Sequence, residues 1–145
     1  MIREIQSSEL EALLELYLSL HETAIPEDTP ALRKVWERIL QDEDHHVIVC
    51  EADGILVSSC VCVIIPNLTR NARPYALIEN VVTRDGYRRK GYGSACLRFA
   101  AETAKNANCY KVMLLTGSKD QGTLEFYRKN GFDSGDKTAF IQRFT

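Results

Sequence analysis

The chain has 145 residues, of which 45% are hydrophobic and 26% are charged, and its net charge at pH 7 is −2. These values predict one globular domain over residues 1–145, with no reason to expect nucleic acid or a membrane as partner. The start lacks the features of a signal peptide, and no apolar run approaches the ~20 residues needed to cross a bilayer. The five cysteines and three histidines form no zinc pattern, so we expect reduced thiols, a cytoplasmic location and no metal.

Hydrophobic periodicity and the positions of glycine and proline predict the element order β-α-α-β-β-β-α-β-α-β-β. The predicted strands are Ile2–Ile5, His46–Glu51, Ile55–Ile65, Tyr75–Thr83, Lys111–Thr116, and last strands at Phe132 and Thr138–Phe144. The first predicted helix begins with a capping box of Ser8 and Glu11 and ends near Leu20. The other predicted helices are Pro30–Gln41, Gly91–Lys105 and Gly122–Asn130. This order predicts a mixed α/β fold, with a central, mostly antiparallel sheet and helices on both faces.

A basic loop that contains two glycines lies between the strand Tyr75–Thr83 and the helix after it. It reads Arg88-Arg89-Lys90-Gly91-Tyr92-Gly93. Glycines allow close approach of the backbone, and the first N–H groups of a helix are free to donate to an anion. A purely structural turn would not explain the three preceding cations. The loop therefore predicts a phosphate-binding site.

Two common phosphate-binding motifs do not fit this loop. A nucleoside triphosphate P-loop needs Lys followed by Ser or Thr, but Ser94-Ala95 follows Gly93. A dinucleotide-binding loop needs a third glycine or alanine where Cys96 stands. The remaining pattern, Arg/Gln-x-x-Gly-x-Gly/Ala, fits at every fixed position.

A second motif, Thr123–Phe132, reads Thr-Leu-Glu-Phe-Tyr-Arg-Lys-Asn-Gly-Phe. With these two motifs in this order, the chain resembles the GNAT superfamily of acetyl-CoA-dependent N-acetyltransferases over nearly its whole length. The resemblance implies the GNAT fold and acetyl-CoA as cosubstrate. It also implies direct transfer, in a ternary complex, to a primary amine of a small-molecule acceptor.

The resemblance further implies which residues bind the donor. The backbone of Val81, Val82 and Thr83 would pair with the pantetheine arm, and an amide at Val81 or Val82 would hold the thioester carbonyl. The pyrophosphate would lie against the loop and the start of the next helix. These residues are Arg88, Arg89, Lys90, Gly91, Tyr92, Gly93 and Ser94.

Two residues are the implied catalytic groups. Tyr127 resembles the general acid of the superfamily, and a tyrosine keeps its proton at neutral pH. The alternative role for Tyr127 is that of a core aromatic residue. Glu79 is the candidate base, and strand alternation would place it on the face of Leu77 and Val81. A buried ion pair between Glu79 and Arg73 is the other interpretation.

The resemblance also implies that the acceptor binds between two connections, His21–Pro30 and Asn67–Pro74. Acids in the first would suit a cationic amine, and arginines in the second a carboxylate or phosphate: Glu22, Glu27 and Asp28, and Arg70 and Arg73. A non-catalytic acyl-CoA sensor and a protein acetyltransferase remain alternative functions. The strand Thr138–Phe144 could also pair across a homodimer.

Overall fold

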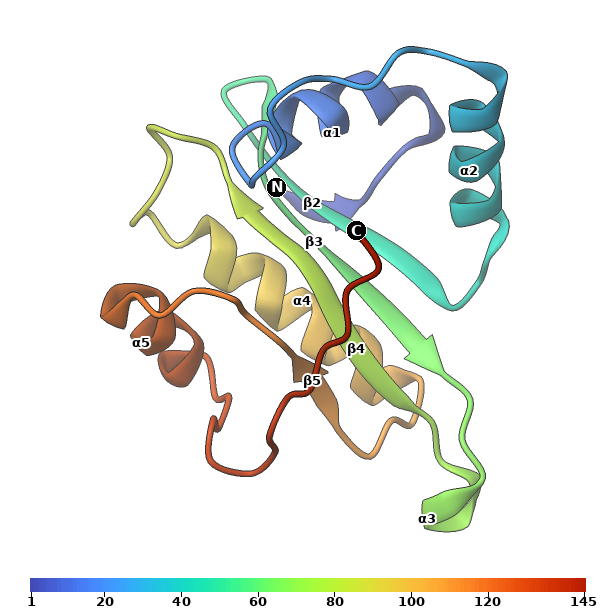
Figure 1. Cartoon of the computed structure of the whole chain (residues 1–145), viewed down its shortest axis with the longest axis vertical. Coiled ribbons are helices and arrows are strands. Elements are labelled where there is room, and N and C mark those ends of the chain that lie inside the picture. The colour runs from blue at the N-terminus through green and yellow to red at the C-terminus, as the bar shows by residue number, and fades with distance from the viewer.

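The computed structural model describes all 145 residues and is built around a five-stranded sheet in the order β1-β2-β3-β4-β5 (Figure 1). Neighbours from β1 to β4 are antiparallel, while β5 runs parallel to β4 after a crossover through a helix. The strands are β1 Ile2–Glu4, β2 His45–Ala52, β3 Ile55–Ile65, β4 Tyr75–Thr83 and β5 Val112–Leu114.

Helices cover both faces of the sheet. The helices α1 and α2 lie on one face, and α4 lies on the other (Figure 1). The helices are η1 Ser7–Glu9 (a 3₁₀ turn), α1 Leu10–Tyr17, α2 Pro30–Gln41, α3 Thr69–Ala72, α4 Tyr92–Asn106 and α5 Gln121–Lys129. This architecture confirms the predicted fold class. None of these helices combines the length and apolar character that crossing a membrane requires.

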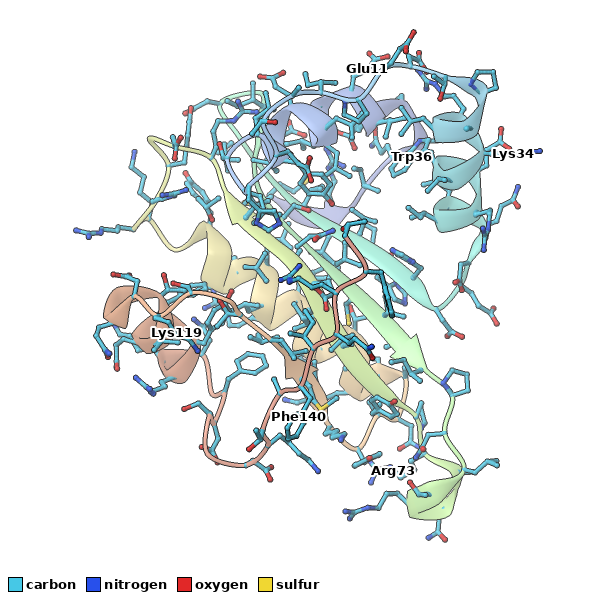
Figure 2. All side chains as sticks on the ribbon, viewed as in Figure 1. Glu11, Lys34, Trp36, Arg73, Lys119 and Phe140 are labelled. Carbon is cyan, nitrogen blue, oxygen red and sulfur yellow. The ribbon has the colours of Figure 1, made fainter.

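Two apolar layers hold the helices on the sheet. Against α4, the core contains Ile48, Ile78 and Leu97, together with four of the five free cysteines. On the opposite face Trp36 of α2 packs against Leu10 and its indole N–H donates to the Ser7 carbonyl over 3.0 Å (Figure 2). The polar atom of this buried indole is therefore satisfied.

Strand β4 contains one extra residue near Asn80. Ser59 lies opposite Val82 and Val61 lies opposite Glu79, so β4 uses three steps where β3 uses two. Asn80 has a left-handed backbone, with φ of 52°. A bulge of this kind reverses which face later side chains occupy.

This reversal is visible in the core. Before the bulge Ile78 packs toward α4, whereas after it Val82 is buried with Leu16 of α1. The prediction that Glu79 and Val81 share one face is therefore wrong, since the inserted residue turns Val81 toward the α4 side.

Three local predictions also differ from the structure. The capping interaction is made by the Gln6 N–H, which donates to Glu9 over 2.8 Å, and does not involve Ser8 and Glu11. The first helix ends at Tyr17 and continues as turns to His21. Neither Phe132 nor Thr138–Phe144 forms a strand, and the sheet ends at β5.

Candidate active site

A cleft of about 1050 Å³ opens where β4 and β5 separate. The two strands pair only as far as Ile78 and Leu114, and beyond that point residues 79–83 have no strand along the β5 side. The cleft brings together the sequence-predicted site residues Glu79, Val81, Val82, Thr83, Arg88, Arg89, Gly91, Tyr92, Gly93, Ser94 and Tyr127.

The loop before α4 is shaped to present backbone N–H groups. Arg89 and Gly91 have left-handed backbones, with φ of 62° and 87°. Such alternation turns successive peptide N–H groups toward one side, where they form an anion-binding concavity. No side chain caps α4, and its first N–H to bond within the chain is that of Ala95, which donates to Gly91 over 3.0 Å. The N-terminus of α4 therefore remains free to bind an anion.

Gly93 has a packing role in this loop. A Cβ at this position would lie 3.1 Å from Cζ of Phe126 and 3.3 Å from Oγ1 of Thr83. The adjacent Ser94 hydroxyl accepts a 3.1 Å hydrogen bond from the Asn130 amide, which also donates to the Phe126 carbonyl. These contacts fix α5 against the start of α4.

The three cations of the loop occupy different positions. Arg88 forms an exposed ion pair with Asp85 over 3.2 Å and lines the cleft, as Arg89 does. Lys90 does not line the cleft; its ammonium lies 5.4 Å from the ring centre of Tyr87. We therefore assign Lys90 to the outer surface of the loop.

Tyr127 enters the cleft from α5. Its ring packs 5.1 Å from that of Phe126 and 6.4 Å from that of Phe132, measured between centroids. Burial raises the pKa of the Tyr127 phenol above its usual value of 10.0, so it is a neutral proton donor at physiological pH.

Glu79 is exposed and lines the same cleft. The alternative ion pair with Arg73 is wrong, because the Arg73 guanidinium donates to the carbonyls of Asn108 and Cys109 over 3.2 and 3.0 Å. A carboxylate in an apolar strand is costly unless it meets solvent or a ligand, and the cleft supplies that environment.

The two segments expected to bind the acceptor behave differently. His21 of the first connection lines the cleft, but no residue of 67–74 does. Arg70 instead lies over the Tyr110 ring, 5.2 Å from its centre. Arg70 belongs to a turn of residues with left-handed backbones, and Arg73 directly follows this turn. In the first connection Asp28 pairs with Arg33 over 2.9 Å, and neither Glu22 nor Glu27 reaches the cleft.

Some lining residues were not predicted from the sequence. Asn80 lines the cleft at the bulge, and Arg143 reaches it from the C-terminal tail. Asparagine tolerates a left-handed backbone better than most residues, which is the one local signal for the bulge. No motif marks Arg143, because its position depends on where the tail lies. No group of three or more His, Cys, Asp or Glu side chains is placed to hold a metal ion.

The chain is similar to known proteins in both sequence and structure. The model of the acetyltransferase (GNAT) family matches residues 10–132. A solved structure of a putative acetyltransferase from Agrobacterium tumefaciens C58 is 42% identical, with a TM-score of 0.92 and 99% of each chain covered. An aminoglycoside N-acetyltransferase solved in complex with CoA shares the fold, with 16% identity, 99% of this chain and 98% of that chain covered, and a TM-score of 0.75.

Curated relatives match over part of their length. A glucosamine 6-phosphate N-acetyltransferase from Trypanosoma brucei brucei is 36% identical over 84 residues, which cover 58% of this chain and 55% of that protein. An uncharacterized N-acetyltransferase from Methanocaldococcus jannaschii is 28% identical over 139 residues, covering 91% of this chain and 60% of the relative. The chain thus spans less than two thirds of these relatives. From its motifs, fold and family match, the chain belongs to the acetyltransferase (GNAT) family.

Proposed function

We propose that this chain transfers the acetyl group of acetyl-CoA to a primary amine of a small molecule within a ternary complex. The main support for this proposal is that three features lie in one cleft. These are the unpaired edge of β4 beyond Ile78, the uncapped start of α4, and the phenol of Tyr127. Each matches a part of the donor: an extended amide chain, a pyrophosphate and a leaving thiolate.

The donor would bind largely through the backbone. The pyrophosphate would accept hydrogen bonds from the first N–H groups of α4 and from the loop around Arg89 and Gly91. The pantetheine arm would add along β4 as an extra strand, because its amides can pair with the unpaired backbone of residues 79–83. An N–H of Val81 or Val82, just after the bulge, would polarise the thioester carbonyl.

The reaction exchanges one bond for another. The neutral amine attacks the thioester carbon, a C–N bond forms and the C–S bond breaks. Tyr127 gives its proton to the departing sulfur, and its raised pKa keeps that proton available at neutral pH. The proton lost by nitrogen passes to Glu79, directly or through a water.

An amino sugar is the acceptor class that we infer. The T. brucei brucei relative is named for glucosamine 6-phosphate, and several structural neighbours are named as aminoglycoside acetyltransferases. In this chain the cleft offers the Glu79 carboxylate to an ammonium group and the Arg143 guanidinium to a phosphate or hydroxyl groups. These opposite charges suit a small polar amine that also carries an anionic or hydroxylated part.

The test is acetylation of an amine panel, followed as thiol release from acetyl-CoA and as mass gain of the amine. The panel contains glucosamine 6-phosphate, glucosamine, an aminoglycoside, spermidine and a lysine peptide. Tyr127→Phe should lower kcat at least about 10²-fold while the Kd for CoA, measured by calorimetry, stays unchanged. Tyr110→Phe is the matched control, since Tyr110 lies outside the cleft and should keep full activity.

Three outcomes would each contradict part of the proposal. If CoA binds but no amine is acetylated, the cleft belongs to an acyl-CoA-binding module. If only the lysine peptide is acetylated, the chain is a protein acetyltransferase. Full activity of Tyr127→Phe would exclude the phenol as the acid.

A further inference from the structure

Two adjacent serines on β3 are the only polar or charged side chains among the buried residues of the chain. Ser58 and Ser59 are both 0% exposed. Burying a hydroxyl is costly unless it is hydrogen-bonded, and both hydroxyls are bonded, but to different strands. Ser59 donates to the Ile48 carbonyl of β2 over 2.7 Å, whereas Ser58 donates to the Val82 carbonyl of β4 over 2.9 Å.

The Ser58 hydroxyl lies in the middle of a short chain of hydrogen bonds. Its oxygen is 3.0 Å from the Thr83 hydroxyl. A serine hydroxyl has a single hydrogen, which here goes to the Val82 carbonyl, so Thr83 is the donor to Ser58. Thr83 lines the cleft, and its Oγ1 lies close to Gly93 at the start of α4. The chain therefore joins the buried side of β3 to the part of β4 that borders the cleft.

The hydrogen bonds to β3 show which way the backbone of β4 points after the bulge. The Val82 carbonyl accepts the bond just described, and the Arg84 N–H donates to the Val57 carbonyl over 2.7 Å. Val82 and Arg84 therefore face β3. Backbone groups of successive residues point to opposite edges of a strand, so the N–H of Val81 faces the other edge, which borders the cleft.

We propose that Ser58 is a positioning residue for the acetyl thioester: its hydroxyl holds β4 so that the N–H of Val81, and not that of Val82, donates to the thioester carbonyl. This role rests on the proposed function and selects one of the two amides named there. The segment needs such a restraint, because its register with β3 is interrupted between Glu79 and Val82. An oxyanion donor is most effective when its direction is fixed before the reaction.

A hydroxyl that served only stability would act differently. Ser58 and Ser59 are equally buried, and each donates one hydrogen bond to a carbonyl of a neighbouring strand. The loss of either hydroxyl should therefore lower the urea midpoint by a similar amount. Only the Ser58 hydroxyl bonds residues that line the cleft, namely Val82 and Thr83. Ser59→Ala is thus the matched control for Ser58→Ala.

The first measurement compares the kinetics of these two variants, once urea unfolding has shown that both are folded. The acceptor is the amine that the unmodified protein acetylates best. We expect Ser58→Ala to lower kcat about tenfold or more, because a misdirected oxyanion donor loses much of its effect, while the Kd for CoA stays unchanged. Ser59→Ala should keep the kcat of the unmodified protein. Equal kcat values in the two variants would overturn the proposal.

The second measurement needs no acceptor and begins with the unmodified protein. Nuclear magnetic resonance compares the ¹⁵N-labelled protein bound to CoA with the same protein bound to acetyl-CoA. The amide proton of Val81 should move downfield when the thioester carbonyl is present, and by more than that of Val82. Ser59→Ala should keep this shift, and Ser58→Ala should lose it.

The two measurements separate failure of this role from failure of the proposed function. If the Val81 shift depends on Ser58 but no amine is acetylated, the proposed transfer is wrong and the role of Ser58 stands. If amines are acetylated but the larger shift is at Val82, or at neither amide, the role of Ser58 is wrong and the proposed transfer stands. A Val81 shift that persists in Ser58→Ala would also exclude this role.

Discussion

Gly93 and Phe126 are packed so closely that a Cβ on Gly93 would lie 3.1 Å from Cζ of the Phe126 ring. We expect Gly93→Ala to lower the free energy of unfolding by about 1–3 kcal/mol, because the methyl group must displace the ring or the helix. Gly117→Ala is the control, since no atom lies within 4 Å of its added Cβ and the effect should stay within about 0.5 kcal/mol. Urea unfolding of both variants checks this, and equal midpoints would show that the contact relaxes freely.

The left-handed backbone of Asn80 should matter for catalysis as well as for stability. A β-branched residue is strongly disfavoured in this conformation, so Asn80→Val should cost about 1–2 kcal/mol and distort the bulge beside the Val81 and Val82 amides. Asn80→Gly keeps the backbone conformation accessible. We expect kcat/KM for acetyl-CoA to fall at least tenfold in the valine variant, and much less in the glycine variant. The bulge would have no role in donor binding if the two variants showed equal kinetics.

The ion pairs around Arg3 should give the protein an acid-sensitive component of stability. Arg3 donates to Glu9 over 2.7 and 2.9 Å and to Glu51 over 2.7 Å, and the Arg3 hydrogen bond holds the pKa of Glu9 below its ordinary 4.5. The stabilisation is therefore complete above pH 4.5 and is lost as the pH falls through the lower folded-state value. We expect Glu9→Gln to destabilise the protein by about 1–3 kcal/mol at pH 7.

Denaturant unfolding at several pH values tests this expectation. The difference between Glu9→Gln and the unmodified protein should shrink as the pH falls below about 4. Glu102→Gln serves as control, because its pair with Lys105 is largely exposed and should contribute less than about 0.5 kcal/mol. A Glu9→Gln effect that does not change with pH would mean that the loss comes from packing alone.

The buried thiols should make the fold sensitive to alkali. Burial raises the pKa of Cys62 from 9.0 to about 12. Its folded state thus keeps a proton that the unfolded chain loses above pH 9, so this stabilisation is present below pH 9 and declines as the pH rises toward 12. One such group changes the unfolding free energy by up to about 1.4 kcal/mol per pH unit.

Replacing the thiol should therefore flatten the alkaline decline. We expect Cys62→Ala to be less stable at pH 7, because it leaves a small cavity, yet to lose less stability between pH 9 and 11. The slopes of unfolding free energy against pH provide the measurement. Parallel slopes for the two proteins would contradict a raised pKa at Cys62.

The helices and long strands could be predicted from the sequence because local residues determine them. The bounds of Pro30–Gln41, Ile55–Ile65 and Tyr75–Thr83 agree with the structure to the residue. Proline after a threonine cap starts the helix, and Pro66 and the Asp53-Gly54 turn bound β3. Periodicity within one segment is enough for such elements.

Features that depend on distant partners could not be predicted in this way. The face of Val81 depends on an inserted residue in the pairing of β4 with β3, and a period-two pattern assumes regular pairing. Thr138–Phe144 has the composition of a strand, but a strand needs a hydrogen-bonded neighbour, and the segment is not part of the sheet. The alternative ion pair between Arg73 and Glu79 was wrong for the same reason. The Arg73 guanidinium donates hydrogen bonds to carbonyls that lie far along the chain.

The junction of β4 with β5 is short, so the C-terminal third of the chain joins the sheet over few residues. Three residue pairs, from Ala76–Val112 to Ile78–Leu114, pair β5 with β4. Beyond them, α5 is held by the packing of Phe126 and Tyr127 against the core and by the Asn130 amide. Elements held by so few bonds open locally at low free-energy cost. A ligand bound between β4 and β5 would contact both strands. It would therefore raise the free energy that this local opening requires.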